Sequence, residues 1–356
     1  MEYTSAACHL RENITGQNWQ LLISMKKTIF IIYISFLFAD YGGGYASSGF
    51  RYGSNAREFS LAGALVADKT PGFYVFSNPA LLQYARTNQF GLSLQSMSLD
   101  RSIQTFSYVK NLPPSAGVGI ALFRYSTDNI MGRDNMNRET EKYSVSETEG
   151  IMSFGVAFGR KLAVGINIKI SFPSMAPEIM DNYGGHQNVN GIFLDFGIIY
   201  KYNRQLILGG KIDNLNGSYN WEILNPCNLD KEERGFQEYP PKTIKLGIAY
   251  NRYKSISIYF QEDIVRIPGN NINYRSRLGV EYRLPNKVKF RGGLAQVRGD
   301  ITSDEKINGS NLKPSFGAGI PIKVWKKQFL QMDYALDLGS AGEGLSHLFS
   351  FSMQLK

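Results

Sequence analysis

The chain has 356 residues and a formal net charge of +9, with 43% hydrophobic and only 19% charged residues, 36 glycines, 21 tyrosines and 22 phenylalanines. This composition excludes a disordered, collagen-like or coiled-coil chain. It also excludes a bundle of transmembrane helices, because no second long apolar run follows the N-terminal one, so any further membrane crossing must be made by β-strands.

The N-terminal residues predict a targeting signal behind an extra leader. Residues 25–27 (Met-Lys-Lys) supply a start and a basic segment, residues 28–39 are apolar, and residues 44–46 offer small side chains to a signal peptidase. A retained N-terminal anchor is the alternative, although an apolar run of this length is too short to span a bilayer as a helix. Cleavage before Ser47 leaves Cys227 as the one cysteine and excludes an intramolecular disulfide.

Apolar residues alternate with small or polar residues along residues 162–172. The even positions are Leu, Val, Ile, Ile, Ile and Phe, whereas the odd positions are Ala163, Gly165, Asn167, Lys169 and Ser171. A helix would spread these apolar side chains around its circumference, but a strand places them all on one face. Strands of about ten residues suit a tilted membrane crossing.

Such segments occur fourteen times after the signal, and an even number returns both ends of a closed antiparallel sheet to the same side of the membrane. The sequence therefore predicts an all-β fold, namely a closed antiparallel transmembrane β-barrel of about fourteen strands. The predicted strands are residues 88–95, 102–109, 116–125, 148–158, 161–171, 190–200, 205–213, 242–250, 255–264, 274–282, 288–296, 313–320, 328–336 and 347–355.

The links between the predicted strands alternate in length and in charge. Links that leave even-numbered strands are short and basic, as at Arg160 and residues 201–204, whereas links that leave odd-numbered strands include the long, acid-containing segments 126–147 and 214–241. Outer-membrane barrels have short periplasmic turns and longer outer loops. The pattern therefore predicts a basic periplasmic rim that favours anionic lipid head groups.

An aromatic residue precedes the short link of each of the first five even-numbered strands and shares the parity of the apolar face. Rings at one height on the lipid-facing side form the interfacial girdle of a transmembrane barrel. We therefore predict a periplasmic aromatic girdle made of Tyr108, Phe158, Tyr200, Tyr250 and Tyr282.

Residues 47–86, between the signal and the first strand, contain Gly, Ala and Pro breaks, a stretch at 56–67 that suits a short helix, and then Asn78-Pro79-Ala80. With these residues, and with strand segments such as Lys161–Lys169 and Pro240–Tyr250 in their order along the chain, the sequence resembles FadL-like outer-membrane barrels, and more closely the PorV/PorQ family.

The resemblance implies a barrel with an N-terminal hatch in the bacterial outer membrane. PorV-type relatives take part in type IX secretion, so the first functional hypothesis is a non-enzymatic barrel that serves protein secretion or surface attachment with other envelope proteins. FadL-type relatives pass hydrophobic compounds, so the alternative is a channel for fatty acids and similar molecules. The implied division of the chain is an upstream extension at 1–24, a signal peptide at 25–46, the hatch at 47–86 and the barrel at 87–356.

The resemblance also implies a gate role for the hatch residues Asn78, Pro79 and Ala80, whereas turn chemistry alone favours a simple anchor. Polar residues on the predicted inner face either select a solute or provide the polar lining that any barrel interior needs. These candidate lumen-lining residues are Asn167, Lys169, Asp195 and Lys211.

Little in the sequence suits catalysis. The mature chain has two histidines, His186 and His347, and neither has a Cys or a second His at ligand spacing, so we expect no metal, no cofactor and no catalytic residue. Ser346 beside His347 is the pair that suggests a hydrolase, and we expect no such activity. The expected partners are outer-membrane lipids, together with secretion or envelope proteins in the first hypothesis or a hydrophobic small molecule in the second. Nucleic acid is not an expected partner, because it is scarce outside the cytoplasm.

Overall fold

The computed structural model describes residues 47–175, 187–224, 233–251, 255–267, 271–298, 310–325, 328–338 and 345–355. The predicted upstream extension and the predicted signal peptide lie outside the described residues. None of the helices within these ranges has the length and the hydrophobicity of a transmembrane helix.

Four short helical turns precede sixteen strands in the described chain. The helical elements are η1 (Ser48–Arg51), α2 (Ala56–Ser60), α3 (Tyr74–Ser77) and η2 (Pro79–Tyr84). The strands are β1 (Asn88–Met97), β2 (Arg101–Leu112), β3 (Ala116–Arg133), β4 (Glu139–Phe158), β5 (Leu162–Met175), β6 (Gln187–Lys201), β7 (Leu206–Asp213), β8 (Tyr219–Leu224), β9 (Glu233–Glu238), β10 (Lys242–Tyr250), β11 (Ile256–Ile267), β12 (Asn271–Arg283), β13 (Lys289–Arg298), β14 (Ser310–Trp325), β15 (Gln328–Asp337) and β16 (Ser346–Leu355).

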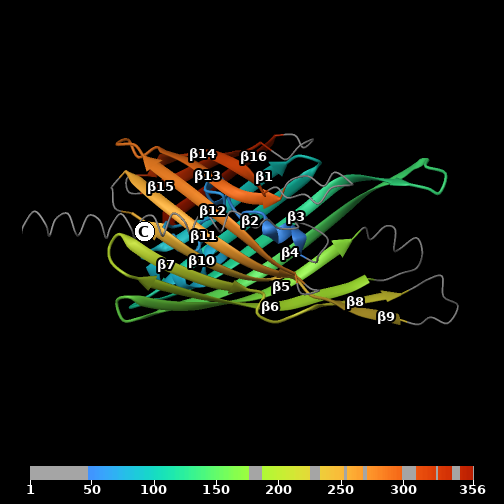
Figure 1. Ribbon diagram of the computed structural model, residues 1–356, viewed down its shortest axis with the longest axis horizontal. Helices are drawn as coiled ribbons and strands as arrows, with labels where there is room; N and C mark the ends of the chain where they lie inside the picture. The colour runs from blue at the N-terminus through green and yellow to red at the C-terminus, as the bar shows by residue number, and fades with distance from the viewer. Residues whose placement is uncertain are drawn as a thin grey trace, which may run out of the picture.

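The strands close into an antiparallel β-barrel with fourteen strand positions around its circumference (Figure 1). Consecutive strands pair from β1 to β7, β7 pairs with β10, pairing continues to β16, and β16 closes the ring by pairing with β1 from Asn88↔Leu355 to Ser96↔His347. The closed antiparallel barrel predicted from the sequence is confirmed, and every one of the fourteen predicted segments coincides with a strand of this ring.

Two strands were not predicted, and both extend strands of the ring. β8 pairs with the first part of β6, beyond the part of β6 that pairs with β7, and β9 pairs with β8. β7 and β8 together thus occupy one strand position of the barrel, with an interruption at residues 214–218, and β9 and β10 occupy the next, with an interruption at residues 239–241. The sequence predicts one loop over the whole of 214–241, because the interruption at Asn214–Ser218 breaks the alternation.

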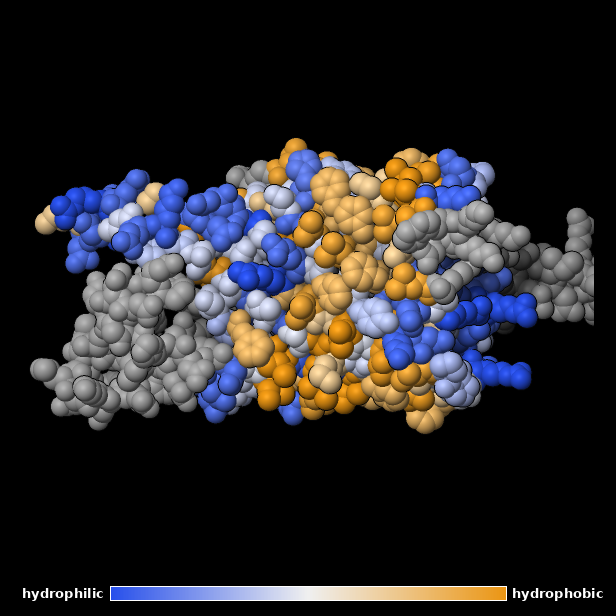
Figure 2. Space-filling model, turned by 180° about the vertical axis from the view of Figure 1, so that it is seen from behind, coloured by the Kyte–Doolittle hydropathy of each residue, from blue (hydrophilic) through white to orange (hydrophobic). Residues whose placement is uncertain are grey.

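The exposure of the side chains is the reverse of that in a soluble protein. Along β5, Ile166 and Ile168 on the outside are 41% and 42% exposed, whereas Asn167 and Lys169 on the inside are 0% and 7% exposed. Figure 2 shows the same inversion on one face of the molecule, where hydrophobic residues cross the middle and hydrophilic residues lie towards both ends. A wall that is apolar outside and polar inside is stable in a lipid bilayer.

The two ends of the barrel differ. At the end where β1 begins and β16 ends, the strands are joined by short turns such as Pro113–Ser115, Gly159–Lys161 and Tyr202–Gln205. We call this the periplasmic end, because short turns and chain termini lie there in outer-membrane barrels. The predicted alternation in link length has exceptions at the outer end, where Ser98–Asp100 and residues 268–270 are also short links.

The long link predicted at 126–147 is a strand extension instead. β3 pairs with β2 as far as Thr127, and β4 pairs with β5 from Val145 onward, but β3 and β4 continue to pair with each other up to Arg133↔Glu139. We call residues 128–144 the projecting hairpin, which extends beyond the barrel at its outer end (Figure 1).

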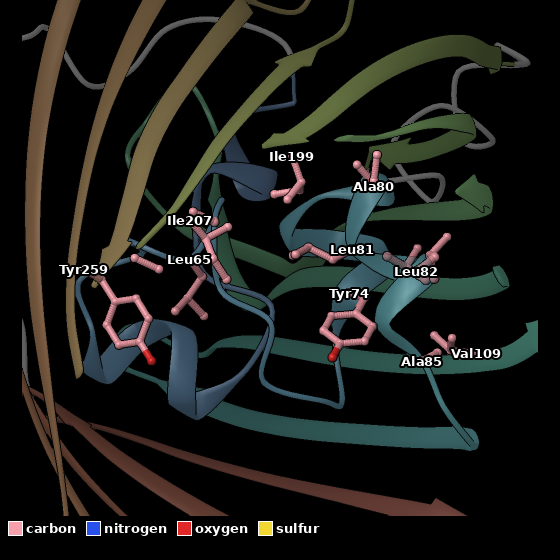
Figure 3. Packing of buried hydrophobic residues seen from close by; sticks show 14 of the residues in the cluster. Leu65, Tyr74, Ala80, Leu81, Leu82, Ala85, Val109, Ile199, Ile207 and Tyr259 are labelled. Carbon is pink, nitrogen blue, oxygen red and sulfur yellow. The ribbon is translucent and has the colours of Figure 1, made fainter. Parts of the chain in front are cut away.

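Residues 47–86, here called the luminal segment, lie inside the barrel. η2 contacts β2 to β6 and α2 contacts β13 to β16, so the segment reaches both sides of the interior. Its residues Leu65, Tyr74, Leu81 and Leu82 are buried in one cluster with wall residues such as Ile199 (Figure 3). The helix expected over 56–67 is shorter, because α2 ends at Ser60 and the chain then turns with positive φ at Ala62 and Gly63.

Candidate functional site

Asn78 connects the luminal segment to itself and to the wall. Its side-chain oxygen accepts a hydrogen bond from the Ala80 backbone N–H at 3.0 Å, which caps η2 at its N-terminus. Its amide nitrogen donates to the carbonyls of Val66 at 3.0 Å, Gly210 at 3.1 Å and Ile198 at 3.3 Å. Asn78 is fully buried, so this one amide satisfies carbonyls from three different parts of the chain.

The wall next to Asn78-Pro79-Ala80 is made of glycine. A Cβ atom at Gly155, Gly165 or Gly197 would collide with atoms of Asn78, Pro79 or Ala80. None of these glycines has a positive φ, so the residue type is explained by the close approach of two backbones rather than by conformation. The luminal segment therefore packs directly against the backbones of β4, β5 and β6.

The four candidate lumen-lining residues form one cluster. The Asp195 carboxylate lies 2.9 Å from Lys169 Nζ and 3.4 Å from Lys211 Nζ, and it accepts a hydrogen bond from the Asn167 amide at 3.1 Å. Two of the four contact the luminal segment: Asn167 donates to the carbonyl of Val75 at 3.2 Å, and Lys211 donates to the carbonyl of Phe76 at 3.0 Å. Asp195 links these two residues to each other. The arrangement holds the luminal segment in place, and the prediction that these residues select a solute remains untested.

A second buried ionic cluster lies on the other side of the interior. Arg57 on α2 pairs with Asp68 of the luminal segment, donates from Nε to Glu281 on β12 at 3.2 Å, and donates from Nη2 to the Tyr259 hydroxyl on β11 at 3.2 Å. Arg291 on β13 binds the same Glu281 carboxylate at 2.8 Å. Opposite charges thus neutralise one another where water is excluded, which is the condition for burying them.

This second cluster is not evident from the sequence. Arg57 lies in a stretch without alternation, and Glu281 and Arg291 are spaced along their strands like any inward-facing residue. The inward parity of Glu281 and Arg291 could have suggested that they face the lumen, but nothing in the sequence pairs them with Arg57. That pairing depends on the path of the luminal segment.

Aromatic rings follow the remaining side of the interior, along β1 to β3. Phe50 and Phe123 contact each other edge to face with ring centroids 5.0 Å apart, Phe76 lies 6.1 Å from Phe123, and Phe73 lies 6.4 Å from Phe76. Tyr52 stacks on Tyr125 at 6.1 Å, nearer the outer end. We call these six residues the aromatic track: Phe50, Tyr52, Phe73, Phe76, Phe123 and Tyr125.

The aromatic track combines buried and accessible apolar surface. Phe73 and Phe123 are buried, whereas Phe50, Tyr52, Phe76 and Tyr125 are only half-buried. Since these rings lie inside the barrel, their free surface faces the interior and not the lipid. An apolar molecule inside the barrel would find contact area along β1 to β3, and polar anchoring groups on the other sides.

The five residues of the predicted girdle all face outward. Phe158, Tyr200 and Tyr282 are exposed, and Tyr108 and Tyr250 are half-exposed on the same outer surface. Each lies close to the periplasmic end of its strand. Their role at the membrane interface remains a prediction.

The Ser346–His347 pair does not have the geometry of a hydrolase. Ser346 is buried inside the barrel and its Oγ accepts a hydrogen bond from the backbone N–H of Ser98 at 3.0 Å, whereas His347 faces outward, with Nδ1 2.9 Å from the Tyr334 hydroxyl. A nucleophile and its base must lie within hydrogen-bonding reach of each other. These two side chains point to opposite faces of β16 and do not meet that condition.

No protein-family model and no curated protein matches the sequence. Solved structures do match. TodX, a toluene transporter of Pseudomonas putida, aligns with a TM-score of 0.57 and 14% identity over 85% of this chain and 98% of TodX. TbuX, a toluene transporter of Ralstonia pickettii, aligns with a TM-score of 0.56 and 13% identity over 86% of this chain and 98% of TbuX.

A FadL homologue of Pseudomonas aeruginosa aligns with a TM-score of 0.55 and 10% identity over 84% of this chain and 97% of the homologue. At these identities the likeness establishes the fold. The chain is a closed, fourteen-stranded antiparallel β-barrel with the fold of these three proteins.

Proposed function

We propose that the protein passes hydrophobic small molecules across the outer membrane. The aromatic track carries this proposal. It places half-buried rings inside the barrel, from Tyr52 and Tyr125 near the outer end to Phe73 beside Gly91 on β1. Half-buried apolar surface inside a barrel with a largely polar wall is favourable where an apolar molecule covers it, so its presence there favours a hydrophobic solute.

The comparisons support the same proposal. The aligned proteins are described as toluene transporters, a monoaromatic hydrocarbon channel and a FadL homologue. Fatty acids and small aromatic compounds both fit the chemistry of the track.

Protein secretion or surface attachment is the second candidate, and the projecting hairpin favours it. Within the turn, Asp134 accepts hydrogen bonds from the backbone N–H groups of Met136 and Arg138, both at 2.9 Å, and Arg133 pairs with Glu139 at 3.0 Å. These contacts order the turn, while Met136 at its tip is 75% exposed. An ordered hairpin with an exposed apolar tip suits contact with another envelope protein, as expected for the PorV/PorQ-like hypothesis.

Uptake measurements test the two candidates. Cells with an intact outer membrane would express the full chain, the chain without residues 47–86, or neither, and would receive radiolabelled toluene or oleate. If the protein is a conduit, cells with the full chain should take up the labelled compound faster than cells without the protein. Equal uptake in all three strains would contradict the conduit, whereas envelope proteins that co-purify with the full chain but not with a variant lacking residues 128–144 would support the second candidate.

A further inference from the structure

The outer surface of the barrel carries a hollow across β2 to β5, with a volume of about 420 Å³. Its walls are two rows of outward side chains. Within each row, successive residues are paired with each other on adjacent strands. The first row is Lys110, Val118, Phe154 and Ile166, and the second row is Tyr108, Ile120, Met152 and Ile168.

The floor of the hollow is the backbone between the two rows. Gly119 on β3 and Ser153 on β4 contribute to it, and both are inward-facing positions that present little side chain to the outside. The hollow is therefore a groove that runs perpendicular to the strands, with apolar walls along most of its length. Across β2 to β5 it spans about 14 Å, since neighbouring strands lie about 4.8 Å apart.

The strand register gives the groove a direction. Tyr108 lies near the periplasmic end of β2 at Leu112, whereas Ile168 in the same row lies further from the periplasmic end of β5 at Leu162. On the next strand, β6, Ile168 pairs with Leu194. Leu194 lies nearer the outer end of β6 than the residues that pair with β7, which begin at Phe196. The groove therefore rises from the periplasmic interface at β2 towards the middle of the membrane at β5.

A positive charge marks the periplasmic end of this groove. Lys110 is exposed at the head of the first row and forms no ion pair with any other residue in the described ranges. Beside it, the half-exposed Tyr108 begins the second row. A cation at the interface attracts an anionic lipid head group, and the apolar walls beyond it offer contact area to an acyl chain.

We propose that this groove binds one anionic glycerophospholipid from the inner leaflet of the outer membrane, with its phosphate at Lys110 and one acyl chain along the two rows. The periplasmic position of Lys110 selects this lipid over lipopolysaccharide, which occupies the outer leaflet. The site is independent of the proposed conduit, because it lies on the outer face of the wall.

The test uses the full chain reconstituted with dioleoyl phosphatidylglycerol that carries a photoactivatable diazirine on one acyl chain. We expect the cross-links to concentrate in β3 and β4, around Ile120 and Met152. Ile120→Trp fills the groove and should reduce the cross-link yield at these strands about fivefold or more. Ile320→Trp on β14 is the matched control, because Ile320 is 50% exposed on the outer face and Ile120 is 52% exposed, and its yield should equal that of the unchanged chain.

Lys110→Gln tests the head group. Retention of phosphatidylglycerol through detergent exchange, measured by native mass spectrometry, should fall about threefold, while Lys201→Gln on the same rim should have no effect. Three results would each overturn the proposal: cross-links spread evenly around the barrel, equal yields for the two Trp variants, or retention of lipopolysaccharide or detergent in preference to phosphatidylglycerol. Heat-dependent gel mobility confirms that each variant is folded.

Discussion

Asn78 joins three segments of the chain through one amide group, so its nitrogen and its oxygen are not interchangeable. Asn78→Asp replaces the donor by a carboxylate oxygen that faces the carbonyls of Val66, Ile198 and Gly210, whereas Asn78→Ala leaves these carbonyls without their donor. A buried group that loses its partner costs about 1–3 kcal/mol, and more when the new group is charged.

We therefore expect both variants to loosen the luminal segment, and Asn78→Asp to do so more strongly. Limited trypsin digestion of the folded barrel in detergent measures this, because cleavage at Arg57 requires the segment to leave the interior. Equal resistance of Asn78→Asp and the unchanged chain would show that the amide does not anchor the segment.

The glycines that face the luminal segment make a second prediction at the level of single residues. A side chain at Gly155 would collide with Pro79, whereas one at Gly150 on the outer face of the same strand would meet its nearest neighbours, Ile170 and Leu122, at 3.9 Å. Overpacking of this kind costs about 1–3 kcal/mol.

Gly155→Val should therefore expose the luminal segment to trypsin, and Gly150→Val should not. The two variants add the same side chain to the same strand, so a difference between them isolates the contact with the segment. Identical digestion patterns would mean that the wall can shift to accept the added side chain.

At the scale of elements, α2 is attached to the wall by Arg57. Arg57→Met removes the partner of Asp68 and one of the three arginines that pair with Glu281. Removing one member of a buried ion pair costs about 3–5 kcal/mol, because the other charge stays buried. We expect hydrogen exchange in residues 54–70 to accelerate strongly in Arg57→Met while β1 to β3 stay protected.

The double variant Arg57→Met with Asp68→Asn provides the control. It removes both charges of the pair within the luminal segment, so exchange in residues 54–70 should be slower than in Arg57→Met alone. Additive effects of the two substitutions would show that Arg57 and Asp68 do not act as a pair.

The strands were predictable because the membrane imposes a strict alternation on them. Residues 162–172 alternate without a break, since lipid lies on one side and the packed interior on the other, and the strand β5 found there begins at Leu162. The luminal segment obeys no such rule. α2 ends at Ser60 because the chain turns to fit between the walls, which is a consequence of tertiary packing that local sequence does not encode.

The candidate site was predictable only in part, for the same reason. Inward parity placed Asn167, Lys169, Asp195 and Lys211 on the inner face, and the structure brings them together around Asp195. Which atoms of residues 47–86 they contact could not be deduced, because those contacts join residues far apart in sequence. The aromatic track was missed because its rings come from both the luminal segment and β3.

At the scale of the whole molecule, the luminal segment packs against the polar inner wall, so we expect it to close the barrel to polar solutes. The wall behind it carries Lys169, Asp195, Lys211, Glu281 and Arg291, all buried while the segment is present. Deletion of residues 47–86 would expose these charges to water and leave a hydrophilic lumen, as in open porin-type barrels. Cells that express the shortened chain should become sensitive to vancomycin, which intact outer membranes exclude.

The control for this deletion is the full chain at the same level of expression in the outer membrane, which should leave vancomycin sensitivity unchanged. If the shortened chain inserts, shows heat-dependent gel mobility and still excludes vancomycin, the luminal segment is not the element that closes the barrel.

The aromatic track is the central element of the proposed conduit, and its apolar character can be removed without changing the outer face. Uptake of radiolabelled toluene by cells with an intact outer membrane would be compared for the unchanged chain, for Phe50→Gln with Phe76→Gln, and for Phe50→Leu with Phe76→Leu. Polar groups that an apolar solute must cover disfavour its passage by about 1–3 kcal/mol each. The conduit predicts that the Gln pair lowers uptake about fivefold or more, to near that of cells without the protein, while the Leu pair retains most of it. Uptake by the Gln pair at the rate of the unchanged chain would contradict it.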